Sequence, residues 1–251
     1  MIKIEKVVTP SSEQWKSVIF GARNAMNSWE KSDSYFDCIN TDNQPCGHRA
    51  LYIGENDLSL MMRLRNAGTD HRKFMRMITV YLDITAPLYW WKEFDTYKVG
   101  TVANSCSTMH KIAAKAFTLE DFSHEHLTGE TDGLWINADG KDFMCSALDF
   151  CQITCDVLNH YRDLYLRTKD KKYWWQMIQL LPSSYNQRRT VMLNYEVLAN
   201  IYKSRRNHKL DEWVDFCKWI ETLPYSELIT GGEFDPHNTP VGMRLDAGLK
   251  D

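Results

Sequence analysis

A change of hydrophobic period constrains this chain more than any other feature of its sequence. Between Phe74 and Ile84, positions 74, 78, 80, 82 and 84 are all apolar and fall on one face of an extended chain. This alternation predicts a strand with one covered face. Ala86-Pro87 is expected to end the strand, and Pro87 suits the first turn of a helix over 87–97.

Elsewhere, apolar residues recur at helical spacing. Ser11 or Ser12 can cap a helix over 11–29, and Gly68 stands just past a second helix over 57–66. One further strand is expected at 2–8. From Ser146 onward the chain is predicted to be mostly helical, and the expected helices cover 146–168, 171–180, 187–204 and 211–223. We therefore predict an α+β fold.

Three stretches lack a clear period. We interpret 31–56 and 110–145 as loop insertions and 231–251 as a C-terminal arm. No linker divides the chain, and 251 residues are enough for one buried core. A single domain over 1–251 is the prediction.

Charge and apolar runs exclude several classes of protein. The 30 Lys and Arg residues against 33 Asp and Glu give a net charge of −3, so no extended nucleic-acid contact is expected. No apolar run reaches the roughly 18 residues of a membrane span, and the N-terminal segment lacks a signal-peptide core. We expect a cytoplasmic protein.

The seven cysteines are expected to be reduced thiols. No metal site is predicted, because His124 and His126 lack a third ligand.

The common nucleotide-binding and hydrolase signatures are absent, and a few polar residues remain as candidates. Asp70-His71-Arg72-Lys73 precedes the strand, where its cations suit either a phosphate or a solvated turn. Asn194 and Asn200 would project about 120° apart on the expected helix. They would line one pocket only if it is wide, and a subunit contact would explain them equally. The helix dipole alone accounts for Arg205 and Arg206.

The order of these features resembles the flavin-dependent thymidylate synthases, the ThyX family. The segment from His71 to Met109 lines up with the family's strand, helix and motif block without a gap, and Ala86-Pro87 falls on a family Ala-Pro. Leu181-Pro182 matches a family Leu-Pro, and Arg23 resembles an N-terminal family arginine. The resemblance covers about residues 2–30 and 57–225. The downstream helix matches the family pattern at Asn194, Leu198, Asn200 and Arg205.

The resemblance implies a ThyX-like domain in which a small antiparallel sheet packs with several long helices. It also implies a cytoplasmic homotetrameric flavoprotein that methylates dUMP, or a related nucleotide, with FAD, NADPH and methylenetetrahydrofolate. His71, Asn194 and Asn200 would contact the flavin. Arg205 would bind the pyrimidine and stabilise the negative charge that develops on it.

The segment that corresponds to the family signature R-H-R-x-x-S-x-N-E-x-S-x-R departs from it. By the resemblance, Lys98 and Asn104 belong to the cofactor site, and Thr101 and Cys106 to the substrate site. Thr108 replaces the last arginine. Losing two charge-assisted hydrogen bonds would weaken ligand binding by about 10²–10⁴-fold unless other cations substitute.

Two functions therefore remain open. The first is a divergent flavin-dependent methylase of pyrimidine nucleotides. The second, favoured by the altered signature, is a fold relative that has lost this chemistry and serves as a nucleotide-binding or assembly protein. For Cys106, a nucleophilic thiolate and a small buried thiol are the two interpretations.

Overall fold

The computed structural model describes residues 2–38 and 49–232. Their contacts group into two compact units. Unit 1 comprises the first residues, Ile84–Thr96 and Asn104–Arg189. Unit 2 comprises Ile4–Asp83, Tyr97–Ala103 and the chain from Thr190 onward. The division falls within the strands of one sheet, and the single domain over 1–251 stays a prediction.

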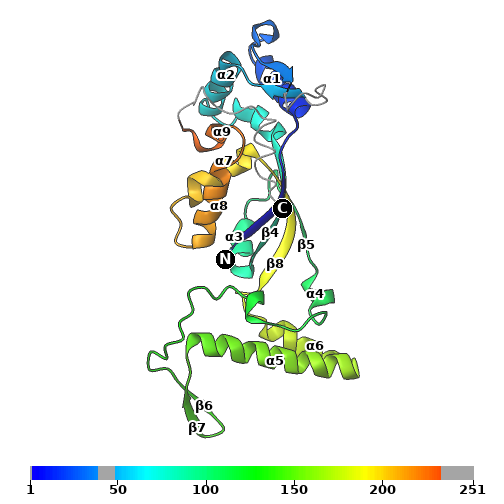
Figure 1. The fold of residues 1–251 in the computed structure, drawn as a ribbon, viewed down its shortest axis with the longest axis vertical. Coiled ribbons are helices and arrows are strands. Elements are labelled where there is room, and N and C mark those ends of the chain that lie inside the picture. Colours follow the sequence, from blue (N-terminus) through cyan, green and yellow to red (C-terminus); the bar gives the residue numbers. More distant parts are fainter. Residues whose placement is uncertain (1, 39–48, 233–251) are drawn as a thin grey trace. The chain divides into compact units, whose positions relative to one another are not determined.

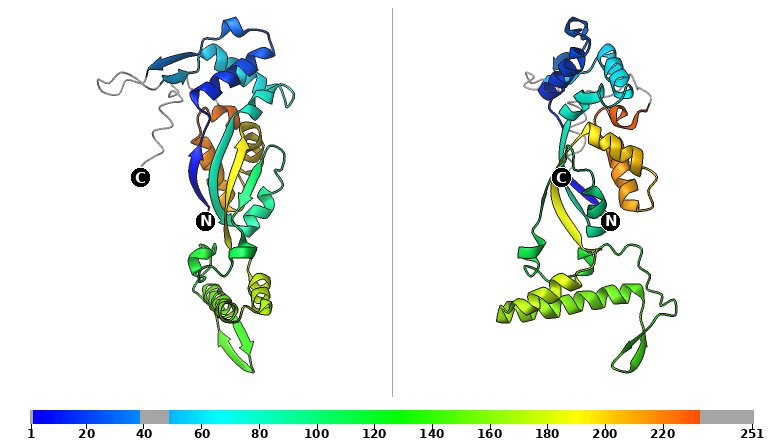
Figure 2. Two further views of the ribbon diagram at one scale, coloured as in Figure 1. Left: turned by 90° about the vertical axis from the view of Figure 1, so that its right-hand side faces the viewer. Right: turned by 180° about the vertical axis from the view of Figure 1, so that it is seen from behind.

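The main sheet has four strands in the order β1-β4-β8-β5 (Figures 1 and 2). The alternation predicted for the second strand is confirmed, since Val80, Leu82 and Ile84 are all buried. That strand begins later than expected, because Phe74 lies in the preceding 3-10 helix, where it is also buried. The strands are β1 (Lys3–Val8), β4 (Thr79–Pro87), β5 (Val102–Ser105) and β8 (Asn186–Asn194), and the 3-10 helix is η2 (Arg72–Met77).

The prediction of a helix over 187–204 is wrong for the first half of that range. Residues Asn186–Asn194 form β8, and α7 begins only at Tyr195 and ends at Arg205. Val191 and Leu193 are buried on either side of a partly exposed residue, which is a two-residue period. The same apolar residues also fit the stripe of an amphipathic helix, so the pattern of this short segment does not distinguish a strand from a helix.

Unit 2 packs its helices around aromatic side chains. Trp15, which is fully buried, meets the ring of Tyr195 edge-on at 5.9 Å and that of Tyr225 at 5.3 Å. Ser11 caps the first helix, as predicted, and forms a capping box with Gln14. The helices of unit 2 are α1 (Ser12–Asn24), η1 (Trp29–Lys31), α2 (Glu55–Asn66), η2, α7, α8 (Asp211–Glu221) and α9 (Glu227–Thr230).

Unit 1 is built on two helices that lie side by side, α5 (Ala147–Thr168) and α6 (Lys171–Leu180) (Figure 1). Both were predicted, and Ser146 and Asp170 cap them. The core beneath them includes Phe117, Phe122, Cys155 and Leu158. Burial raises the pKa of the Cys155 thiol to about 11, so this cysteine is a structural group. The shorter helices are α3 (Leu88–Phe94), α4 (Thr108–Lys111) and η3 (Leu119–Asp121).

The segments expected to be loops contain short strands. Within 110–145, β6 (Trp135–Ala138) and β7 (Lys141–Met144) form an antiparallel hairpin. Asp139 and Gly140 both have positive φ at its tip, which is the Asp-Gly turn typical of two-residue hairpins. Within 31–56, β2 (Tyr35–Cys38) pairs with β3 (Arg49–Tyr52). Residues 39–48 and 233–251, which include most of the predicted arm, lie outside the described residues.

Candidate functional site

Glu196, in the first turn of α7, holds the segment before β4 against that helix. Its carboxylate accepts hydrogen bonds from Arg72 Nε at 3.2 Å and from Arg76 Nη2 at 3.3 Å. Burial by itself would raise the pKa of Glu196, but the hydrogen bonds and charges of the two guanidinium groups outweigh burial and lower it. The carboxylate therefore stays ionised and fixes η2 beside α7.

Arg72 also joins this segment to Asn200, which the resemblance assigns to the flavin. Arg72 Nη2 donates to Asn200 Oδ1 at 3.2 Å. The amide nitrogen of Asn200 then remains as a donor on the exposed side of the helix. His71, one residue earlier, stands at the N-cap of η2 with an exposed side chain. The structure thus brings the segment that carries His71 against the helix that carries Asn200.

Asn194 has a structural role that the sequence did not reveal. It is the N-cap of α7 and is nearly buried; its Oδ1 accepts from Val197 N at 3.0 Å, and its Nδ2 donates to Gly100 O at 3.4 Å. Gly100 has φ +80°, and a Cβ there would lie 2.6 Å from Asn194 Nδ2. Both ends of the amide are therefore engaged inside the protein.

Arg205, at the end of α7, lies against an aromatic wall. Its Nε donates to the hydroxyl of Tyr97 at 3.0 Å, and its guanidinium stands 4.9 Å from the ring centre of Trp213. Its Nη1 also lies 2.9 Å from His208 Nε2. The stacking orients the guanidinium group, and a substrate would have to meet it in this orientation.

The four candidates from the altered signature segment divide between the two units. Lys98 and Thr101 belong to unit 2; Lys98 is exposed, and Thr101 Oγ1 is buried without a partner among the described residues. Asn104 and Cys106 belong to unit 1, and both are exposed. The interpretation of Cys106 as a buried thiol is therefore wrong. Its backbone N–H donates to Arg188 O at 2.9 Å, which extends the pairing of β5 with β8.

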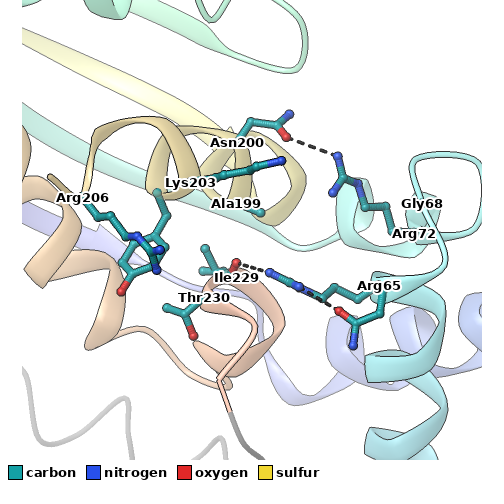
Figure 3. Close-up of a pocket in the computed structure, with 11 residues that line it drawn as sticks. Arg65, Gly68, Arg72, Ala199, Asn200, Lys203, Arg206, Ile229 and Thr230 are labelled. Atoms are coloured by element: carbon teal, nitrogen blue, oxygen red, sulfur yellow. Dashed lines mark hydrogen bonds between the residues drawn. The ribbon is translucent and has the colours of Figure 1, made fainter. Parts of the chain in front are cut away.

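A cavity of about 370 Å³ lies in unit 2 between the ends of three helices (Figure 3). Four of its 11 lining residues are cationic and none is acidic. We call it the cationic pocket. Asn200 is the only predicted site residue in its wall, and Tyr202 and Thr230 contribute hydroxyl groups. The cations are Arg65, Arg72, Lys203 and Arg206.

Sequence reasoning missed most of this pocket. Arg65 and Lys203 each lie in the last turn of a helix, where the dipole already favours a cation. They are 138 positions apart in the chain, so no local pattern links them. Only the fold places them around one cavity.

Two features are absent from the described residues, namely a metal-binding cluster and a membrane-spanning helix. No group of three or more His, Cys, Asp or Glu side chains in the described ranges is arranged to hold a metal ion. Among the described helices, none is long and apolar enough to cross a membrane.

The arrangement of strands and helices matches solved structures of nucleotide-binding enzymes. A crystal structure of thymidylate synthase X (ThyX) from Helicobacter pylori with FAD and dUMP has a TM-score of 0.59 to this chain. The match covers 92% of this chain and 98% of that chain, at 16% sequence identity. The chain has the fold of ThyX. A second Helicobacter pylori ThyX structure, complexed with FAD and dUMP, matches at a TM-score of 0.57 and 15% identity over 92% and 98% of the two chains.

A related enzyme shares the same fold. The UMP/dUMP methylase PolB from Streptomyces cacaoi, bound with 5-Br dUMP, matches with a TM-score of 0.56 and 14% identity over 92% of this chain and 95% of that chain. No protein-family model and no curated protein matches the sequence. The resemblance to ThyX and the α+β fold expected from the sequence are confirmed at the level of the fold.

Proposed function

We propose that this chain is a flavin-dependent methylase that acts on dUMP or a related pyrimidine deoxynucleotide. FAD is the proposed cofactor, and NADPH and methylenetetrahydrofolate are the proposed co-substrates. The fold supports this proposal, because the ThyX neighbours were solved with FAD and dUMP and a further neighbour is a UMP/dUMP methylase. A homotetramer is proposed on the same basis and is testable by sedimentation.

One observation carries the proposal. The Arg72–Asn200 hydrogen bond and the Arg72–Glu196 ion pair hold the segment that carries His71 against α7. His71 and Asn200 are far apart in sequence, yet the resemblance to the ThyX family assigns both to one flavin. Their segments are adjacent in the structure, as a shared site requires.

The residues present fit the phosphate-bearing part of FAD. The cationic pocket offers guanidinium and ammonium groups, which suit phosphate oxygens, and the amide nitrogen of Asn200 is a donor on its wall. The buried Thr101 Oγ1 is a further group that lacks a partner among the described residues. A bound flavin would supply the hydride, and the chain would orient the nucleotide beside it.

Arg205 is the proposed catalytic residue. Its guanidinium group would donate to a uracil carbonyl and stabilise negative charge on the pyrimidine, while Tyr97 and Trp213 keep it in place. Lys98 and Asn104 are proposed for the cofactor, and Thr101 and Cys106 for the substrate. For Asn194 we propose an indirect role, because both ends of its amide are engaged at the start of α7.

A second candidate function is a ThyX-fold protein that binds a nucleotide without flavin chemistry. The engaged side chain of Asn194 favours it, since a residue assigned to the flavin serves as a helix cap instead. Thr108 in place of the last signature arginine favours it as well, because a neutral hydroxyl cannot supply the charged fork of a guanidinium group.

Titration of one purified sample with FAD and then dUMP, followed by calorimetry and visible absorbance, separates the two functions. A flavin enzyme binds FAD, and dUMP then perturbs the flavin spectrum. Protein that ignores FAD but releases heat with dUMP would support the second function.

Arg205→Ala tests the proposed catalytic residue. We expect the variant to lose nucleotide-dependent reoxidation of the flavin by about a hundredfold or more, because one preorganised charge is removed from the transition state. Its assembly state should stay that of the unmodified chain. Arg63→Ala, which removes an exposed arginine from α2, is the matched control and should react normally. Full activity in Arg205→Ala would refute the assignment.

A further inference from the structure

The turn that joins α5 to α6 in unit 1 gathers positive charge (Figure 1). From Arg162 to Lys172, five residues are Lys or Arg and two are Asp, which gives a local charge of +3. The whole chain, by contrast, has a net charge of −3. Three aromatic residues follow directly, at 173–175. We call residues 162–175 the basic–aromatic tip.

Ion pairs compensate only part of this charge. Both aspartates of the tip are already paired within it, Asp163 with Arg162 at 3.1 Å and Asp170 with Lys172 at 3.3 Å. The other three cations of the tip have no carboxylate partner in the described part of the chain. They are Arg167, Lys169 and Lys171. Three positive charges are therefore left for an anion outside the chain's own ion pairs.

Helix dipoles account for some of these cations and oppose others. Arg167 and Lys169 lie at the C-terminal end of α5, where the dipole favours positive charge. Lys171 and Lys172 are the first two residues of α6, where the dipole disfavours it, and the first turn of α6 contains no acidic residue. The stability of α6 therefore does not explain why lysines begin this helix.

Aromatic rings hold the unpaired lysines in place. Lys171 Nζ lies 5.6 Å from the ring centre of Trp175 and 6.0 Å from that of Trp174. Lys169 Nζ lies 5.9 Å from the ring centre of Tyr165. A cation–π contact orients the ammonium group but leaves its charge and its N–H donors available to an anion.

Trp175 gives the tip an exposed aromatic surface on a fixed base. Its side chain is 43% exposed. It packs edge-on against Trp174 at 4.8 Å, and Trp174 Nε1 donates to Met109 O at 3.1 Å. The indole of Trp175 is thus held by an anchored neighbour while nearly half of its surface stays in contact with water.

We propose that the basic–aromatic tip binds a short stretch of single-stranded nucleic acid, with its unpaired cations on phosphates and Trp175 stacked on a base. Cations beside exposed aromatic rings suit the alternating phosphates and bases of a single strand, whereas the bases of a duplex already stack on one another. An acidic protein would need only the cations. A membrane surface would need an apolar apex, yet residues 168–170 are polar and exposed.

The proposed contact is local. The net charge of −3 argues against an extended nucleic-acid surface, but three unpaired cations can meet about three phosphates. The proposal goes beyond the methylation and does not rest on it.

The test is fluorescence anisotropy of a red-dye-labelled oligothymidylate of about 12 nucleotides, titrated with the full chain over a range of salt concentrations. Excess dUMP and FAD are present, so that the oligonucleotide cannot occupy the nucleotide sites proposed above. We expect the logarithm of the binding constant to fall with the logarithm of the salt concentration with a slope of about −2, since each of about three phosphates contributes about −0.7 in a single strand. If the oligonucleotide does not bind at low salt, or dUMP or FAD displaces it, the proposal is wrong.

Lys171→Gln locates the phosphate contacts. Lys171 has no ion pair to lose, so the variant should fold normally, and its salt slope should be shallower by about 0.7 because one phosphate contact is removed. Lys218→Gln is the matched control; it removes an exposed lysine of α8 in unit 2, which pairs with Asp215 at 2.9 Å, and should leave the slope unchanged. An unchanged slope in Lys171→Gln, or the same change in both variants, would overturn the proposal.

Trp175→Leu separates a nucleic acid from other anionic partners. We expect it to weaken binding of the oligonucleotide about tenfold without changing the salt slope, because stacking is lost while the phosphate contacts remain. Phe150→Leu, which changes a 54% exposed ring in the first turn of α5, is the control and should bind normally. Full binding by Trp175→Leu would contradict the proposal. So would polyglutamate or phosphatidylserine vesicles binding as tightly as the oligonucleotide, since the partner would then be an acidic protein or a membrane.

Discussion

At the scale of single residues, the most constrained polar group is Asp57 on α2. It is 1% exposed and forms an ion pair with Arg23, whose Nε lies 2.6 Å from Asp57 Oδ1. Its other oxygen accepts from the hydroxyl groups of Ser32 and Ser34, both at 2.6 Å. One carboxylate thus joins α1, α2 and the segment after η1.

Asp57→Asn should lower the free energy of unfolding by about 3 kcal/mol, because Arg23 would remain buried without a counter-charge. Urea denaturation followed by circular dichroism measures this change. Asp215→Asn is the matched control, since its pair with Lys218 is exposed and worth about 0–1 kcal/mol. Similar losses in the two variants would contradict a special role for Asp57.

The pH dependence of stability gives an independent test of the same residue. Burial tends to raise the pKa of Asp57, but its hydrogen bonds to Ser32 and Ser34 and the charge of Arg23 lower it below the ordinary value. The stabilisation is therefore present above the ordinary pKa of Asp and is lost as the pH falls through the lower, folded value. As the pH falls below about 4, the unmodified chain should lose more stability than Asp57→Asn. Parallel curves would contradict this prediction.

At the scale of elements, the start of α7 is where the interpretation of the sequence and the structure differ most. The strand β4 could be predicted from its alternation, because a polar or half-exposed residue separates each of its buried apolar residues from the next. The segment before α7 carries apolar residues that fit both periods, and only its pairing in the sheet makes it a strand. Caps such as Ser146 were predictable, because the residue preference is local.

Asn194→Ala should destabilise the chain by about 1 kcal/mol, since Val197 N loses its capping oxygen. Asn194→Asp keeps that oxygen and should restore most of the loss. Thermal unfolding of both variants measures the effect. If the two are equally unstable, the bond from Nδ2 to Gly100 matters more than the cap.

At the scale of the whole molecule, the chain has the fold of its structural neighbours at only 14–16% sequence identity. The α+β fold could be predicted, because it depends on period and spacing, whereas the segments around His71 and Asn200 were singled out by the resemblance to the ThyX family. The cationic pocket could not, since Arg65, Arg72 and Lys203 come from three elements and each has a local explanation. The site therefore depends on how the chain folds more than on any motif.

Product analysis by mass spectrometry tests the proposed methylation most directly. The purified chain is incubated with dUMP, methylenetetrahydrofolate, FAD and NADPH, and the nucleotide is then recovered. We expect a product heavier than dUMP by one CH₂ group, formed only when the flavin is present and lost in Arg205→Ala. Unchanged dUMP from a folded, FAD-bound chain would contradict it.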